Sequence, residues 1–350
     1  MKSYQVAEFG APLQLAEREA PQPEGTQVRL RVRAAGVCHS DLHIWEGGYD
    51  LGHGKRLSLQ ARGIALPLTM GHETVGEVVA VGPEAEGVRV GDVRLAYPWI
   101  GCGKCEVCRA GDENLCMQPR FLGIHCDGGY ADEILVPHPR YLVDIAGIDP
   151  AQAAPYACSG LTTYSALRKF GDMLHKEPLL IIGAGGLGLM CLSLMKAMDA
   201  HGAIVVDIDA RKREAAMEAG ALAAIDGKAD DALAQVVAAA GGPMRGALDL
   251  VGSAASADLG FNVLVKGGKL VIVGLFGGAA PWPLPYIPMK AATIQGSYVG
   301  NLAELRELID LVRRKNVASI PTSRRPLDQA SETLEALHRG EIVGRAVLVP

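Results

Sequence analysis

The segment LLIIGAGGLG, residues 179–188, decides the fold class of this chain. An apolar strand-like run is followed by glycines spaced G-x-G-x-x-G, and an apolar helical stretch opens inside that motif. In this context the first glycine permits a tight turn, the second lets the backbone approach a pyrophosphate at the helix N-terminus, and the third lets helix and strand pack closely. The segment therefore predicts a dinucleotide site whose contacts in the turn are Gly183, Gly185, Gly186, Leu187 and Gly188.

The next predicted strand, AIVVDID (residues 203–209), carries an acid that indicates which dinucleotide binds. Asp207 can accept both hydroxyls of an adenosine ribose and would repel a 2′-phosphate, which favours NAD over NADP. Lys212 is placed to reach the same ribose. The alternative is a glycine-bearing turn that binds nothing, and the combination of strand, glycines and acid argues against it.

Outward from this motif, apolar strands alternate with helical stretches. Strands are expected at residues 179–184, 203–209, 222–226, 247–252, 269–276 and 292–300. Helices are expected between them, at residues 186–200, 209–220, 231–242 and 255–265. Such alternation predicts an α/β fold with a doubly wound parallel sheet. Two further helices, at residues 302–316 and 328–340, and a final strand, at residues 344–350, complete the chain.

The part that precedes residue 155 has a different character. Short β-type runs cut by Gly and Pro, at residues 27–36, 73–82 and 91–99, predict an all-β region with long loops. A chain of 350 residues suits two domains rather than one. Apolar residues make up 49% and charged residues 21%, which argues against disorder.

Charge and hydropathy exclude several classes of partner. A formal net charge of −5 and the lack of a Lys/Arg cluster argue against nucleic acid. The N-terminal residues lack the apolar core of a signal peptide, so we expect a cytoplasmic protein. The one long apolar run, residues 179–198, contains glycines and a lysine, and a buried strand followed by a helix explains it better than a membrane span.

Half of the eight cysteines fall in one stretch, CGKCEVCRAGDENLC. Two short gaps and one longer gap let a loop wrap four thiolates tetrahedrally around one Zn²⁺ in a closed, structural site. A redox-active C-x-x-C pair is the main alternative, and disulfides are disfavoured in a reducing compartment. The predicted ligands are Cys102, Cys105, Cys108 and Cys116.

A second constellation can be assembled from separate segments. A catalytic zinc takes three protein ligands and keeps one open position. Cys38 follows a predicted strand, and His72 and Glu73 precede another. Cys158 lies about where the all-β region ends and the part with the parallel sheet begins. Taken singly, Cys158 could be a small buried residue and His72 a histidine on a turn. Together with a dinucleotide domain they predict a Cys₂His site in the cleft between domains.

At this point the residues resemble a known family, the zinc-dependent medium-chain alcohol dehydrogenases, over nearly the full length of the chain. The resemblance is carried by GVCHSD, GHE, CGKCEVCRAGDENLC, CSGLTTY and GAGGLG with Asp207, and is greatest to the prokaryotic secondary-alcohol type. It implies a GroES-like β domain with the zinc lobe (residues 1–157), a Rossmann domain (158–298) and a C-terminal return to the first domain (299–350). It also implies two Zn²⁺ per chain, one catalytic and one structural, and a tetramer.

The resemblance assigns further roles. Cys38, His72 and Cys158 would hold the catalytic zinc, with Glu73 beside the metal as an exchangeable ligand. Asp41 would orient His72, and Ser40 and His43 would pass the substrate proton outward; His43 could equally be a solvated surface group. The remaining cofactor contacts would come from His39 and Arg345 at the pyrophosphate, Thr162 at the nicotinamide, and Leu275.

The resemblance implies hydride transfer between NAD and a primary or secondary alcohol. Pocket candidates are Trp99, Leu122, Ile124, Leu275 and Val299, which favour a medium-sized apolar, cyclic or aromatic alcohol. The chain departs from many members in a long segment, Trp45 to Met70, that could shape the substrate entrance or a subunit contact. Two rivals remain open: a polyol or amino-alcohol dehydrogenase of the same superfamily, and a non-catalytic, redox-sensing NAD protein with structural zinc only.

Overall fold

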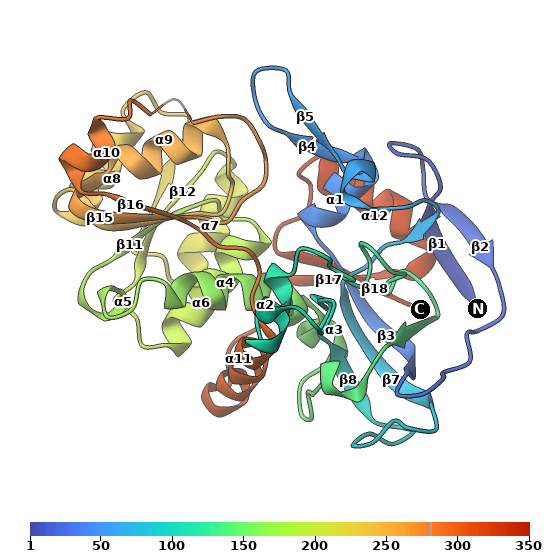
Figure 1. The fold of residues 1–350 in the computed structure, drawn as a ribbon. Coiled ribbons are helices and arrows are strands. Elements are labelled where there is room, and N and C mark those ends of the chain that lie inside the picture. The colour runs from blue at the N-terminus through green and yellow to red at the C-terminus, as the bar shows by residue number, and fades with distance from the viewer. Residues whose placement is uncertain (281) are drawn as a thin grey trace.

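The computed structural model describes residues 1–280 and 282–350, and its strands form two large sheets (Figure 1). One sheet has six strands in the order β13-β12-β11-β14-β15-β16, all parallel. The order reverses between β11 and β14, which creates the crevice where ligands of doubly wound sheets bind. The strands are β11 (Leu179–Ile182), β12 (Ala203–Asp207), β13 (Ala223–Asp226), β14 (Met244–Asp249), β15 (Leu264–Ile272) and β16 (Thr293–Gly296).

Helices cover both faces of this sheet. The strand β11 requires this, because its side chains are apolar on both faces. Leu179 and Ile181 belong to a buried cluster with residues of α6, whereas Leu180 and Ile182 belong to a separate cluster with Val236 of α8 and Phe261 of α9. The helices are α6 (Gly186–Ala197), α7 (Ala210–Glu218), α8 (Ala232–Ala240), α9 (Ala254–Asn262) and α10 (Tyr286–Lys290).

The other large sheet has the path β10-β8-β7-β3-β18-β17, and β9 pairs with β3 beside it. The C-terminal strand β18 lies between β3 and β17, so the chain's last residues return to its first part. These strands are β3 (Val28–Val37), β7 (Glu73–Val81), β8 (Val93–Ala96), β9 (Glu133–Val136), β10 (Leu142–Asp144), β17 (Thr322–Pro326) and β18 (Arg345–Val349). The predicted GroES-like plus Rossmann architecture is confirmed.

Smaller elements surround this sheet. β1 (Lys2–Val6), β2 (Gln14–Glu17) and β6 (Leu68–Thr69) form a three-stranded sheet, and β4 (Gly48–Asp50) and β5 (Arg56–Ser58) form a hairpin. The helices are α1 (His39–Glu46), α2 (Glu106–Arg109), α3 (Pro150–Ala153) and α12 (Ala330–His338). A further short helix, α5 (Met173–Lys176), lies instead beside the six-stranded sheet (Figure 1). Single 3₁₀ turns are η1 (Gln60–Arg62), η2 (Glu113–Leu115), η3 (Pro139–Tyr141), η4 (Ala154–Ala157) and η5 (Leu327–Gln329).

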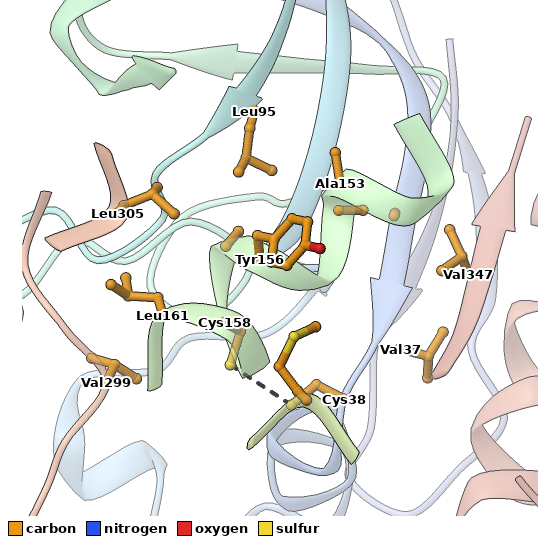
Figure 2. Close-up of a cluster of buried hydrophobic side chains, with 14 of the residues drawn as sticks. Val37, Cys38, Leu95, Ala153, Tyr156, Cys158, Leu161, Val299, Leu305 and Val347 are labelled. Atoms are coloured by element: carbon orange, nitrogen blue, oxygen red, sulfur yellow. Dashed lines mark hydrogen bonds between the residues drawn. The ribbon is translucent and has the colours of Figure 1, made fainter. Parts of the chain in front are cut away.

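The two large sheets are joined by a continuous apolar core. Helix α4 (Ser159–Arg168) follows η4 and packs against α6 and against α11 (Leu302–Lys315). Figure 2 shows part of this core, in which Tyr156, Leu161 and Val299 lie near the sulfurs of Cys38 and Cys158. The predicted metal ligands are therefore held by a packed junction between the two parts of the chain.

The strands and helices predicted between residues 179 and 300 are all present. Several boundaries differ. The largest difference is at β15: the helix predicted at 255–265 ends at Asn262, and β15 begins at Leu264, because Leu264 pairs with Met244 of β14. Two helices that line the junction, α1 and α4, were not predicted. The domain boundaries 157/158 and 298/299 stay predictions. Among the described residues, no helix combines the length and apolarity that a membrane span requires.

Candidate metal and cofactor sites

Three segments bring the predicted catalytic ligands together. Cys38 follows β3 and caps the N-terminus of α1, while His72 and Glu73 stand at the start of β7. Because β3 and β7 are antiparallel and Gly36 pairs with Glu73, the end of one strand meets the start of the other. Cys158 separates η4 from α4. Ligand atoms of these four residues all lie within 4.8 Å of one another.

The cluster fits a zinc ion. The sulfurs of Cys38 and Cys158 are 3.8 Å apart, which is the edge of a tetrahedron with Zn–S bonds of about 2.3 Å and is far too long for a disulfide. Nε2 of His72 is buried and has no hydrogen-bond partner, as expected of a ligand atom aimed at a metal. All four side chains are buried, so the site excludes bulk water.

Asp41 fixes the orientation of the histidine ligand. Its carboxylate lies 3.1 Å from Nδ1 of His72 and accepts hydrogen bonds from the Tyr130 hydroxyl at 2.9 Å and the Cys38 backbone N–H at 2.9 Å. Since a carboxylate only accepts, Nδ1 carries the ring proton and Nε2 is left for the metal. Burial opposes a charged ring, yet this carboxylate raises the pKa of His72, so metal binding displaces a proton. No pattern in the sequence pointed to Tyr130 as a partner of Asp41.

Glu73 lies beside the predicted ligands and is held there by contacts of its own. One carboxylate oxygen lies 3.4 Å from Arg345 and accepts from the backbone N–H of Ser159 at 3.3 Å, while the other is buried without a partner. Burial raises its pKa to about 8, against the opposing charge of Arg345. The space is tight, because a Cβ on Gly36 would come 2.0 Å from the second oxygen.

The four cysteines of the lobe also converge. Neighbouring sulfurs are 3.4–3.9 Å apart, again near the edge expected for tetrahedral Zn–S bonds of about 2.3 Å. Backbone N–H groups point at the sulfurs of Cys105 and Cys116, which stabilises thiolates. Glu113 adds a fastening that was not predicted: it accepts from Gly101 N–H at 3.0 Å and from the Tyr141 hydroxyl at 2.8 Å.

The glycine turn has the geometry that each glycine was expected to permit. Gly183 has φ +101°, a conformation that favours glycine. A Cβ on Gly188 would lie 2.1 Å from the carbonyl oxygen of Gly183, so only glycine allows this close helix–strand packing. A Cβ on Gly185 would meet nothing within 4 Å, which leaves open space where a pyrophosphate is predicted to approach. Gly186 lies next to Arg345, whose guanidinium carbon would be 3.3 Å from a Cβ there.

Asp207 and Lys212 flank this turn. Asp207 accepts from the backbone N–H of Ala184 at 2.7 Å, which ties the acid at the end of β12 to the glycine turn. Lys212, on α7, makes no hydrogen bond or ion pair with the described residues. The pKa of His39 is lowered to about 4 by the enclosing protein, although part of its ring is exposed, and the charges of Arg345 and Lys212 act in the same direction. Arg345 and Lys212 thus bring two positive charges near His39, where an anionic cofactor is expected.

The predicted relay residues lie on α1. Ser40 Oγ is 3.8 Å from the sulfur of Cys38, and the His43 ring packs against Tyr49 with centroids 4.8 Å apart. No hydrogen bond joins Ser40 to His43 across the part of the chain described, so their cooperation stays a prediction that needs a bridging group. Thr162 on α4 has a buried hydroxyl without a partner, consistent with its predicted place beside the nicotinamide.

Three aromatic rings, those of Trp99, Phe121 and Tyr298, form a wall that begins beside His72. The buried Trp99 donates to the carbonyl of Ala157 at 2.9 Å, and its ring lies 5.4 Å from that of His72. Phe121 and Tyr298 continue the wall at 5.3 and 6.4 Å from Trp99. Of the other predicted pocket residues, Leu122 and Val299 are buried, Ile124 is half-buried and Leu275 is exposed. Sequence reasoning missed Phe121 and Tyr298.

The long segment Trp45 to Met70 reaches the cofactor-binding part of the chain. Its hairpin, β4–β5, places the carbonyl of Asp50 where it accepts from the backbone N–H of Gly278 at 3.2 Å. At the hairpin tip, a Cβ on Gly52 would lie 2.8 Å from the nitrogen of Ala279. The segment therefore bridges the two parts of the chain on the side where strand β15 ends (Figure 1).

Comparison with known proteins agrees with this geometry. Residues 24–147 match the alcohol dehydrogenase GroES-like domain, and residues 186–314 match the zinc-binding dehydrogenase family. The chain is 38% identical to an NAD-dependent alcohol dehydrogenase of Sulfurisphaera tokodaii and 37% identical to one of Saccharolobus solfataricus. Both alignments cover 100% of this chain and 100% of the relative.

A solved structure shows the same arrangement. The alcohol dehydrogenase of the hyperthermophilic archaeon Aeropyrum pernix superposes with a TM-score of 0.90 at 32% identity, and the match covers 100% of each chain. The D-arabinose dehydrogenase of Sulfolobus solfataricus is more distant, with a TM-score of 0.83 at 27% identity over 100% of this chain and 99% of the other. With two cysteine-containing metal clusters, a glycine turn and these relatives, the chain belongs to the zinc-dependent medium-chain alcohol dehydrogenase family.

Proposed function

We propose that this NAD-dependent alcohol dehydrogenase oxidises medium-sized apolar, cyclic or aromatic alcohols to the corresponding ketones or aldehydes, and reduces these in the reverse direction. Membership of the family carries the alcohol chemistry; the preference for apolar substrates is the proposal. The observation that supports it most is the wall of Trp99, Phe121 and Tyr298, which begins beside the ligand His72 and brings apolar ring surface to the reacting centre.

Residues of this chain hold the parts in place. Cys38, His72 and Cys158 would hold a zinc ion, which supplies Lewis acidity that lowers the pKa of a substrate hydroxyl. Asp41 holds a proton on Nδ1 of His72 and fixes the ring, so that Nε2 is the nitrogen presented to the metal. The buried surroundings strengthen every charge interaction at the site, since water is excluded.

NAD supplies the hydride acceptor, and the chain positions it. Gly183, Gly185 and Gly188 shape the turn for the pyrophosphate, and Arg345 supplies positive charge beside His39. Asp207, at the end of β12, would accept the adenosine ribose hydroxyls. Ser40 would take the substrate proton, since its hydroxyl lies 3.8 Å from the sulfur of Cys38, and His43 on the same helix would carry the proton onward.

A polyol or sugar dehydrogenase is the second candidate. One relative, 29% identical over 100% of this chain, is a D-arabinose 1-dehydrogenase that uses NADP(+). Two features weigh against this assignment: the aromatic wall offers few hydrogen-bond partners for a polyol, and the carboxylate of Asp207 would repel the 2′-phosphate of NADP.

The experiment combines metal counting with a substrate panel. Purified protein should contain two zinc ions per chain, one for each cluster, by mass spectrometry of metals. With NAD, the rate of NADH formation should be higher with cyclohexanol or benzyl alcohol than with sorbitol or threonine. A His72→Ala variant should keep one zinc and lose turnover. Faster oxidation of sorbitol than of benzyl alcohol would contradict the proposal and would indicate a polyol dehydrogenase.

We further propose that the chain assembles as a homotetramer and acts in the cytoplasm. Support for self-association comes from apolar side chains exposed around α10 and the edge strand β16, where Leu284 is 76% and Met289 64% exposed. Most of the segment 280–289 is exposed, although Trp282 and Ile287 are half-buried, and its Pro281 lies outside the described residues. Light scattering of the purified protein tests the assembly: a monomer would contradict it.

A further inference from the structure

Glu46, the last residue of α1, lies between two histidines that are far apart in sequence. One carboxylate oxygen is 3.8 Å from Nδ1 of His43, three residues earlier on the same helix. The other oxygen is 3.5 Å from Nδ1 of His338, the last residue of α12, which packs against α1. The ring of Trp45 meets His338 edge to face at 5.8 Å and helps to hold the outer histidine. Glu46 thus bridges His43 and His338 with its two oxygens.

The three side chains form a gradient of exposure. The exposed fraction rises from 15% for the His43 side chain to 36% for Glu46 and 52% for His338. Imidazole can accept a proton at one ring nitrogen and release another from the opposite nitrogen. Since Nδ1 of His43 faces Glu46, Nε2 remains available for a proton that arrives from the side of Ser40. The arrangement therefore has an inner end, a bridge and an outer end in contact with water.

The geometry points to Glu46 as a positioning and proton-accepting residue that extends the relay from His43 to His338 and solvent. The inference rests on the proposed function, in which His43 carries the substrate proton. In alcohol oxidation Nε2 of His43 gains a proton and its Nδ1–H is lost to the Glu46 carboxylate, so the ring stays neutral overall. Glu46 then returns to the carboxylate by passing that proton to His338 or to water, and reduction runs the same steps backwards.

Other charges around His43 set the direction of the expected effects. Burial lowers the pKa of His43, the negative charges of Glu46 and Cys38 oppose this, and Arg56 on the neighbouring strand β5 adds to it. The pKa of His39, one turn earlier on α1, is lowered to about 4, so this ring is uncharged at neutral pH, and Tyr49 covers the His43 ring without a charge. Removing the carboxylate at position 46 therefore leaves Arg56 unopposed from that side and makes His43 a weaker base.

The test is Glu46→Gln, which keeps size and removes the proton acceptor. We expect kcat for oxidation of benzyl alcohol at pH 7 to fall about tenfold, at the low end of general acid–base effects because water still reaches the exposed end. The acid limb of the kcat–pH profile should move to lower pH, the solvent deuterium isotope effect should increase, and added imidazole should restore part of the rate. His338→Gln should change the same readouts in the same direction, by about threefold in kcat, since it removes only the outer end.

The matched control is Glu335→Gln, on the same helix as His338, because Glu335 pairs with Arg339 and not with a relay histidine. It should leave kcat, the pH profile and the isotope effect unchanged. A Glu46→Gln enzyme that matches the wild type in these three readouts would overturn the extended relay. If His43→Gln still slowed proton release in that case, the proposed function would stand; if wild-type protein with full zinc failed to oxidise any alcohol, the proposed function itself would fail.

Discussion

The two metal clusters use similar ligands but are built in opposite ways. Cys102, Cys105, Cys108 and Cys116 come from a single lobe, supply sulfur only, and leave two of their members partly exposed. Cys38, His72 and Cys158 come from three separate segments, include an imidazole, and are buried. The lobe is a local structure that closes around its ion, whereas the other cluster forms only when β3, β7 and the junction of η4 with α4 have packed together.

This difference predicts a structural role for the lobe cluster and a chemical role for the other cluster. Four sulfurs leave no open position, so the lobe cluster can hold chain segments but cannot bind a substrate. The other cluster has three predicted ligands, which leave a fourth position open, and Asp41 accepts a hydrogen bond from the far side of the His72 ring. The lobe has its own fastening, through Glu113, that does not involve the metal. Each of the following predictions compares a change in one cluster with a matched change in the other.

The largest expected effect is on turnover after Cys38→Ala. We expect kcat/KM to fall roughly a thousandfold or more, because several kcal/mol of charge stabilisation are lost and each 1.4 kcal/mol is about tenfold. NAD binding, measured by fluorescence titration with NADH, should be nearly unchanged, since the glycine turn lies on another element. The control is Cys191→Ala, a buried cysteine outside both clusters. Equal loss of turnover and NAD binding would mean that Cys38 has only a structural role.

The next effect concerns stability, through Cys105→Ser in the lobe. Zinc content should fall by one ion per chain, and unfolding should become easier by several kcal/mol, because metal binding contributes roughly that much to folding free energy. Turnover per folded molecule should change much less than in Cys38→Ala. Metal analysis, thermal melts and limited proteolysis of the lobe measure the three quantities. A Cys105→Ser protein with full zinc and unchanged melting would remove the distinction between the clusters.

A smaller effect is expected from Asp41→Asn, which alters the support of a ligand but not the ligand itself. Zinc affinity or activity should fall about 10- to 100-fold, because an amide no longer fixes the proton on Nδ1 of His72. The counterpart in the lobe is Glu113→Gln, which should reduce stability and leave zinc affinity of the catalytic cluster unchanged. Chelator competition and steady-state kinetics compare the two variants. Wild-type affinity in Asp41→Asn would contradict the role given to Asp41.

The smallest expected effect is a difference in labelling rate between cysteines of the two clusters in metal-depleted protein. Backbone N–H groups of Lys104 and Cys105 lower the pKa of Cys102 to about 6, so its thiolate should be the main form at pH 7 and should decline as the pH falls through 6. Iodoacetamide should therefore modify Cys102 before Cys158, whose pKa is raised and whose side chain is buried. Peptide mass spectrometry gives the order, and earlier labelling of Cys158 would contradict it.

The sequence predicted best what depends on neighbours along the chain. The run at residues 179–188 and the four cysteines of the lobe are recognisable because strand, turn, helix and ligand spacing are all local. Helix α1 was missed because its eight residues mix polar and apolar side chains without a clear period and are set by Cys38 and Asp41 at its start. Contacts such as Tyr130 with Asp41 depend on strands that meet only in the folded molecule.

Contacts between residues far apart in the sequence also limited the prediction of the relay and of the hairpin. Glu46 and His338 are separated by nearly the whole chain and meet because α12 packs against α1. Their types were visible, but nothing in the spacing could pair them. The hairpin of the long segment is another example, since its contact with Gly278 crosses between the two parts of the molecule.

The close approach of Glu73 to Gly36 has a consequence for how this protein can change over generations. Position 36 can accept no side chain while Glu73 is in place, because any Cβ there would collide with the carboxylate. Replacement of the acid by a shorter residue would open that space, and only then could position 36 vary. The residue tolerated at position 36 therefore depends on the residue at position 73, and a mutant library that varies position 36 alone would score it as immutable.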